Sequence, residues 1–139
     1  MNKLKIISVM VLFGFFQAPQ AEEAQNCVPP DAPLPANWTQ PYEAHRVIGN
    51  LYAVGGAGLS AYLVTSEEGH ILINTGLADS TPWMRKNIAS LGFDIKDVKV
   101  LLTTQAHFDH TAALAEIKQL TGAKMLATPE DARVLVDGG

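Results

Sequence analysis

The 139-residue sequence contains little charge and a single cysteine. Cys27 has no partner for an intramolecular disulfide, which leaves a free or intermolecular thiol. Charged residues make up only 17% of the chain, the net charge is −4, and no run of basic residues interleaved with aromatic ones occurs. The sequence therefore excludes nucleic-acid binding and a polybasic attraction to membranes. Its 47% hydrophobic share and its length suit one modest globular domain.

An apolar run long enough to cross a membrane is also missing. The run over residues 6–16 is about half of the roughly 20 residues that a bilayer helix needs. Two lysines precede it and small or polar residues follow, which predicts a secretory signal peptide over residues 1–21, cleaved after Ala21. A membrane anchor is the less favoured alternative, and the polar residues before Cys27 disfavour a lipid anchor. We therefore expect an exported, periplasmic protein without stable membrane anchoring.

A polar, proline-rich segment follows over residues 22–45. Proline fixes φ and favours extended backbone, so this segment is predicted to be an N-terminal arm and not a domain. Trp38 and Tyr42 in the arm, like Trp83 further on, are expected to pack, although the arm could also flank a cleft. The folded domain is expected over residues 46–139, without internal repeats.

Three short apolar runs open this domain. Residues 47–54 predict a strand bent at Gly49-Asn50, and residues 61–65 and 71–73 predict two more. The turns between them make an antiparallel meander. The glycines of residues 55–58 lack the full G-x-G-x-x-G spacing and sit between strands, so they indicate a hairpin loop and not a nucleotide-binding loop.

Helical and strand patterns then alternate. Ser80-Thr81-Pro82 starts a helix that Gly92 ends. A strand over residues 98–103, a helix from Thr111 to Leu120 and a strand over residues 124–127 follow. Thr128-Pro129-Glu130-Asp131 fits a capping box and opens a last helix that ends at Gly138. This alternation predicts an α/β fold, with helices packed on a largely parallel part of the sheet.

The chemistry is concentrated between the strand that ends near residue 104 and the next helix. Gln105, His107, Asp109 and His110 fall within six residues there, beyond the carboxyl end of a strand, where open α/β sheets place their ligands. Imidazole nitrogen and carboxylate oxygen are donors that zinc prefers. The alternative is a polar loop with two surface histidines. The sequence favours a metal site, and His45 and His70, which stand alone, are assigned structural or surface roles.

This segment resembles the H-x-H-x-D-H motif of the metallo-β-lactamase superfamily. Further matches to the third subclass of class B β-lactamases are Gly49-Asn50-Leu51-Tyr52, residues 59–63, residues 69–76 and Asp137-Gly138-Gly139. The resemblance implies the N-terminal half of a four-layer αβ/βα sandwich. Asn74 stands where many members have aspartate, and it either hydrogen-bonds near the motif or serves as a plain turn residue.

The resemblance also implies a zinc ligand set. His107 would ligate a first Zn²⁺, while Asp109 and His110 would ligate a second. Gln105 stands where the superfamily usually has histidine, which matches the Gln-bearing, GOB-type branch. An amide oxygen is a weaker zinc ligand than imidazole, so the first site would be loosened or empty. The alternative is that Gln105 only hydrogen-bonds groups around the ligands.

The activity implied is hydrolysis of the β-lactam amide bond, the basis of antibiotic resistance, by metal-bound hydroxide without a covalent enzyme intermediate. Asp109 would be catalytic, orienting the nucleophile. The sequence has no serine-nucleophile motif such as S-x-x-K or G-x-S-x-G, which agrees with metal chemistry. The alternatives are another superfamily hydrolase, a lactonase or thioesterase, or an inactive truncated metal-binding fragment.

We expect a small β-lactam as the partner and a monomer for the full-length protein. The resemblance implies two further histidine ligands in a second half, and no histidine follows His110. We therefore expect the chain to be an N-terminal fragment that is unstable or inactive by itself.

Overall fold

The computed structural model describes residues 33–137. The predicted signal peptide over residues 1–21 and its cleavage point, Cys27, the start of the arm and Gly138-Gly139 lie outside the described residues. Within residues 33–137, no helix combines the length and the apolar character needed to cross a bilayer.

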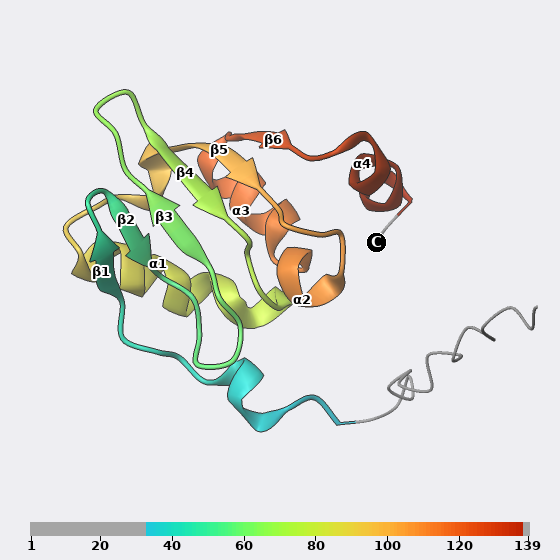
Figure 1. Cartoon of the computed structure of the whole chain (residues 1–139), viewed down its shortest axis with the longest axis horizontal. Helices are drawn as coiled ribbons and strands as arrows, with labels where there is room; N and C mark the ends of the chain where they lie inside the picture. The colour runs from blue at the N-terminus through green and yellow to red at the C-terminus, as the bar shows by residue number, and fades with distance from the viewer. Residues whose placement is uncertain (1–32, 138–139) are drawn as a thin grey trace, which may run out of the picture. The chain divides into compact units, whose positions relative to one another are not determined.

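The centre of the fold is one six-stranded sheet whose strands lie side by side in the order of the sequence (Figure 1). The first four strands form an antiparallel meander, and the last two run parallel to the fourth. Both features were predicted. The strands are β1 (His45–Ile48), β2 (Leu51–Ala53), β3 (Tyr62–Val64), β4 (His70–Ile73), β5 (Val98–Leu102) and β6 (Lys124–Leu126).

The first predicted strand is in fact two. Ile48 pairs with Leu51, so Gly49 and Asn50 form the tight turn of a hairpin between β1 and β2, and not a bend within one strand. Gly49 has φ +54°, a left-handed conformation that glycine adopts without steric cost. The bend predicted at Gly49-Asn50 is therefore a complete reversal of the chain.

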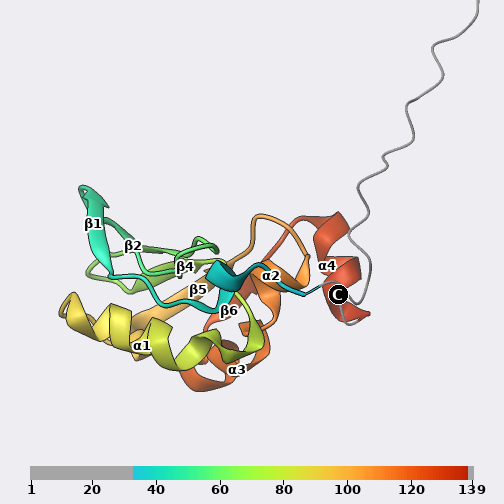
Figure 2. The same cartoon turned by 90° about the horizontal axis from the view of Figure 1, so that it is seen from below.

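Helices cover one face of the sheet. The helices α1 (Thr81–Ser90) and α3 (Leu114–Thr121) lie on the same side of it (Figure 2). The other elements are the short helix α2 (Phe108–Thr111), the helix α4 (Pro129–Val136) and the 3₁₀ turns η1 (Ala36–Thr39), η2 (Ala78–Ser80) and η3 (Ile95–Asp97). The α/β class predicted from the alternating pattern is therefore confirmed.

The core lies between the sheet and these two helices. Leu63, Leu72 and Leu101 are neighbours across β3, β4 and β5, and each is fully buried. Met84 and Ile88 of α1 and Ile117 of α3 pack against them. The alternate side chains point to the opposite face of the sheet and are only partly buried, although they are apolar: Tyr62, Val64, Ile71, Ile73, Val100 and Leu102.

The helix predicted from Thr111 to Leu120 is interrupted. The structure has α2 and α3 in its place, with two alanines between them. The amide of Ala112 donates both to the carbonyl of Phe108, at 2.9 Å, and to the carbonyl of Gly76, at 3.1 Å. This contact with the segment after β4 holds α2 at the end of the sheet, so the chain must turn before α3 begins. Gly122, with φ +70°, ends α3 as predicted.

Removal of a core side chain tests the placement of the helices. Leu72→Ala should lower the free energy of unfolding by about 2–5 kcal/mol, because it leaves a cavity among buried side chains. Ile71→Ala, next to it on the uncovered face, removes a side chain of equal size and should cost less than half as much. Urea unfolding followed by circular dichroism measures both. Equal losses would contradict the assignment of the covered face.

Candidate metal centre

The loop over residues 103–107 connects the end of β5 to α2 and lies beyond the carboxyl ends of β4 and β5. Because these two strands are parallel, the segments that follow them meet at the same edge of the sheet. The amide of Asn74 donates to the carbonyl of Leu102 at 2.9 Å, and the amide of Thr75 donates to the carbonyl of His110 at 2.8 Å. The backbone after β4 therefore holds the loop at both of its ends.

Asn74 is the side chain that fixes the start of the loop. It is buried and has φ +63°, a left-handed conformation that asparagine tolerates better than most residues. Its Oδ1 accepts hydrogen bonds from the Thr104 amide at 3.0 Å and the Thr104 hydroxyl at 3.2 Å. The Thr103 hydroxyl lies 3.4 Å away, but its shorter hydrogen bond goes to the carbonyl of Gln105. Of the two roles left open by the sequence, hydrogen bonding next to the motif is the one observed.

The ring of His110 is oriented by this network. Its Nδ1 lies 3.1 Å from Oγ1 of Thr104. The Thr104 hydroxyl donates its proton to Asn74, so its oxygen is free to accept the N–H at Nδ1. With the N–H at Nδ1, Nε2 carries the lone pair and lies 3.3 Å from Oδ2 of Asp109. A hydrogen bond that fixes the tautomer of a histidine in this way is typical of metal ligands.

The donors supplied by Asp109 and His110 fit zinc. Two ligand atoms at about 2.0–2.1 Å from a tetrahedral zinc ion lie about 3.3–3.4 Å apart. The 3.3 Å between Asp109 Oδ2 and His110 Nε2 matches that separation. A carboxylate oxygen and an imidazole nitrogen at this separation can share either a proton or a zinc ion.

Gln105 lies against the same histidine. Its Nε2 is 2.8 Å from Nε2 of His110, which is the distance of a hydrogen bond from the amide to the ring nitrogen. This contact supports the role of Gln105 as a hydrogen-bond partner of a ligand. Its role as a ligand stays a prediction.

His107 is placed differently from the other three predicted site residues. It precedes α2 as its N-cap, and its carbonyl accepts from the His110 amide and the Thr111 hydroxyl, each at 2.9 Å. Its side chain is exposed, and within residues 33–137 its ring makes no hydrogen bond or ion pair. The structure therefore brings Gln105, Asp109 and His110 together but not His107. The same part of the chain holds no cluster of three His, Cys, Asp or Glu side chains suited to a metal ion.

Two residues of the loop network were not singled out from the sequence. Thr104 supplies the hydroxyl that orients His110, and Asp131 of α4 accepts a hydrogen bond from the Ala106 amide at 3.1 Å. Thr104 directly precedes the motif, which was the available signal. Asp131 was recognised only as a member of a capping box.

The arm reaches the same loop. The rings of Trp38 and Phe108 lie 6.3 Å apart between centroids, tilted by 53°. On its other side the arm contacts the hairpin loop after β2, where a Cβ on Gly58 would lie 2.8 Å from Cδ1 of Trp38. Trp38 therefore packs between the hairpin loop and the first residue of α2, directly after the loop over residues 103–107 (the metal loop), as expected for a packing residue.

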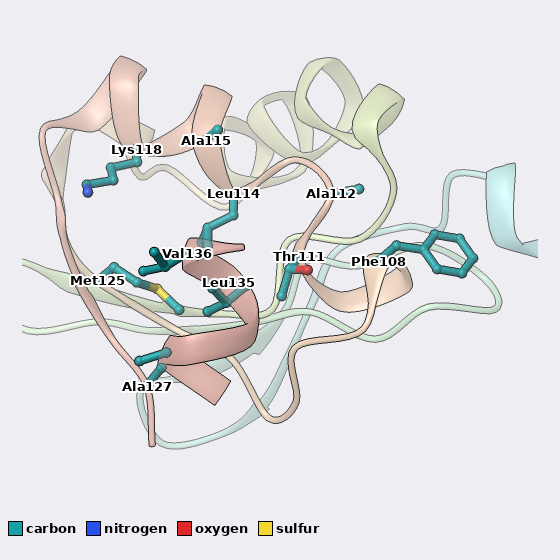
Figure 3. Close-up of a pocket in the computed structure, with 11 residues that line it drawn as sticks. Phe108, Thr111, Ala112, Leu114, Ala115, Lys118, Met125, Ala127, Leu135 and Val136 are labelled. Carbon is teal, nitrogen blue, oxygen red and sulfur yellow. The ribbon is translucent and has the colours of Figure 1, made fainter. Parts of the chain in front are cut away.

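An apolar cavity of about 610 Å³ lies next to the loop but does not contain the donors. Leu114, Met125, Leu135 and Val136 are among the residues that line it, and Phe108 points away from these four (Figure 3). Gln105, His107, Asp109 and His110 are not among the lining residues. The candidate metal donors thus lie outside this cavity.

The comparison with known families decides the identity of the fold. The model of the metallo-beta-lactamase superfamily matches residues 54–139, more than half of the chain. The chain belongs to the metallo-beta-lactamase superfamily. This confirms the family stated from the motif, and the six-stranded sheet with its helices corresponds to the N-terminal half of the metallo-beta-lactamase fold.

Solved structures of metallo-beta-lactamases match the chain at 43–51% sequence identity. The class B3 di-zinc enzyme LRA-12 from an Alaskan soil metagenome is 50% identical, with a TM-score of 0.76, over 78% of this chain and 41% of its own. GOB-18 from Elizabethkingia meningoseptica is 51% identical, with a TM-score of 0.67, over 68% of this chain and 35% of its own. BJP-1, a subclass B3 enzyme of Bradyrhizobium japonicum, is 43% identical, with a TM-score of 0.63, over 65% and 34%.

These matches confirm the resemblance to the third subclass and, through GOB-18, to its GOB-type branch. The chain spans less than half the length of each of these metallo-beta-lactamases, between 34% and 41%.

Substitution of Asn74 tests the network that holds the metal loop. Asn74→Gly keeps the left-handed backbone but removes the acceptor of the Thr104 amide, which should cost about 1–3 kcal/mol. Thermal unfolding should then show a Tm lower by at least about 4 °C for a domain of this size. Asn74→Asp retains an oxygen at the same place and serves as the matched control. A Tm lowered equally by both substitutions would show that the oxygen is not what holds the loop.

Proposed function

We propose that the protein to which this chain belongs hydrolyses the amide bond of β-lactams with the help of zinc. The observation that carries this proposal is the 3.3 Å separation of Asp109 Oδ2 and His110 Nε2 at the carboxyl end of the sheet. The 50% sequence identity to LRA-12, a class B3 di-zinc metallo-beta-lactamase, supports both the metal and the substrate class. No observation favours a lactonase or thioesterase over this function.

Each residue of the motif has a role in the proposed reaction. Asp109 and His110 would hold one zinc ion, and His107 would be a ligand of a second. Bound zinc supplies a Lewis acid and a water molecule of lowered pKa. The carboxylate of Asp109 would accept a hydrogen bond from the attacking water and so orient it towards the lactam carbonyl.

Gln105 modulates this site through His110. Its amide donates to the lone pair that zinc would use, so the amide must move away or present its oxygen when the metal binds. An amide oxygen binds zinc more weakly than imidazole does. We therefore assign the more firmly held ion to Asp109 and His110.

Within residues 33–137, the donors brought together do not complete a zinc centre. Catalytic zinc sites use three protein ligands and keep one position for water. Asp109 and His110 supply two donors to one ion, so a further ligand from outside the segment 105–110 belongs to the proposed centre.

Asp109 provides the direct test of the proposal. Asp109→Ala should lower the turnover of nitrocefin or imipenem by about a hundredfold or more. Substitution of a residue that only supports a metal ligand typically lowers activity about 10–100-fold, and loss of a ligand itself should lower it at least as much. Asp97→Ala is the matched control. Asp97 is an exposed carboxylate just before the first residue of β5, at the end of the strand away from the motif, so its substitution should leave turnover unchanged. A chelator should abolish turnover in the unaltered protein. Turnover that survives both the chelator and Asp109→Ala would refute zinc hydrolysis.

We also propose that the protein is exported to the periplasm. The motivation is the charged, apolar and then small-residue pattern of residues 1–21. In a Gram-negative host, osmotic shock should release a chain whose first residue is Glu22, as read by N-terminal sequencing. Deletion of residues 6–16 should keep the chain in the cytoplasm. A full-length chain that begins at Met1 and stays in the cytoplasm would contradict export.

A further inference from the structure

The carboxylate of Asp131 has two different partners. Asp131 is the third residue of α4, and its Oδ2 accepts from the hydroxyl of Thr128 at 2.9 Å. The hydroxyl oxygen of Thr128 in turn accepts from the Asp131 amide at 3.1 Å, which is the helix cap predicted from the sequence. Oδ1 of Asp131 accepts from the amide of Ala106 at 3.1 Å, although Ala106 lies 25 residues earlier in the chain.

This second hydrogen bond departs from an ordinary capping box. In that motif the side chain at the third helical position returns to the backbone amide of the capping residue. Here the carboxylate reaches the metal loop instead. Ala106 is buried, at 5% exposure, and stands between Gln105 and His107. A buried amide needs an acceptor, and Asp131 provides it.

The loop is therefore held from two sides. Asn74 and Thr75, after β4, bind Thr104 and the carbonyl of His110. Asp131 binds the middle of the loop from α4, on which none of the residues Pro129–Val136 is fully buried. The side chains of Leu135 and Val136 line the cavity beside the loop, so apolar packing holds α4 only loosely (Figure 3).

We propose that Asp131 is a positioning residue of the metal centre. Its carboxylate fixes the backbone between Gln105 and His107, and it couples the position of α4 to the geometry of the metal loop. The part of this inference that concerns zinc rests on the proposed function. The hydrogen bond itself does not, because it is formed by protein atoms alone.

Two readouts separate this role from that of a simple helix cap. The first is the Kd for Zn²⁺, measured by competition with a chromophoric chelator. The second is the rate of amide hydrogen exchange at Ala106 in protein treated with a chelator. A cap that acts only on α4 would change neither, because Ala106 is not part of the helix.

Asp131→Ala should raise the Kd for Zn²⁺ about tenfold, the lower end of what is typical for residues around metal ligands. It should also accelerate exchange at Ala106 by about tenfold or more, since the amide loses its acceptor. Asp131→Asn keeps an oxygen at Oδ1 and should restore most of both values. Glu130→Ala is the matched control, because Glu130 is an exposed neighbour whose ion pair with Arg133, at 3.5 Å, lies on the surface.

If the alanine variant does not fold, Asp131→Ser replaces it, because the serine hydroxyl is too short to reach Ala106. This variant should have a higher Kd for Zn²⁺ and faster exchange at Ala106 than Asp131→Asn. Unchanged exchange at Ala106, or faster exchange with an unchanged Kd, would overturn the proposal. If the unaltered protein binds no Zn²⁺, the proposed function fails. The exchange rate at Ala106 then still decides whether Asp131 holds the loop.

Discussion

The loop over residues 103–107 depends on the hydrogen bonds that the side chain of Asn74 accepts from the amide and the hydroxyl of Thr104. Parallel pairing of β4 and β5 brings the end of each strand to one edge of the sheet, but it does not orient any ligand. Asn74 does so through Thr104, whose hydroxyl links the amide oxygen to Nδ1 of His110. Asn74, at the end of β4, thus determines that Nε2 of His110 is the ring nitrogen free to bind a metal.

Much of this arrangement could be predicted from the sequence because its signals are local. The turn residues between short apolar runs predict the meander, and the change to helical spacing predicts the parallel part of the sheet. Asp109 and His110 are consecutive, so no distant contact is needed to bring them within 3.3 Å. The break between α2 and α3 depends on the carbonyl of Gly76, which no local pattern reveals.

The orientations of the remaining site residues could not be predicted for the same reason. The motif predicts both Gln105 and His107 as ligands of the first zinc ion. In the structure the amide of Gln105 points towards His110, whereas the ring of His107 is exposed. Asp131 fits a local capping pattern, but one of its oxygens serves a residue of another segment. Spacing identifies residue types that suit a chemistry, whereas the three-dimensional contacts decide where each side chain points.

The short helix α2 connects metal binding with folding. Four residues are far too few for a helix that is stable by itself, and two of them are Asp109 and His110. A zinc ion held by both side chains, as proposed, would stabilise α2 in the conformation seen here. The backbone of α2 contacts the segment after β4 through Thr75 and Gly76. Free energy gained by binding the proposed zinc ion would therefore also stabilise the packing of α2 against the sheet.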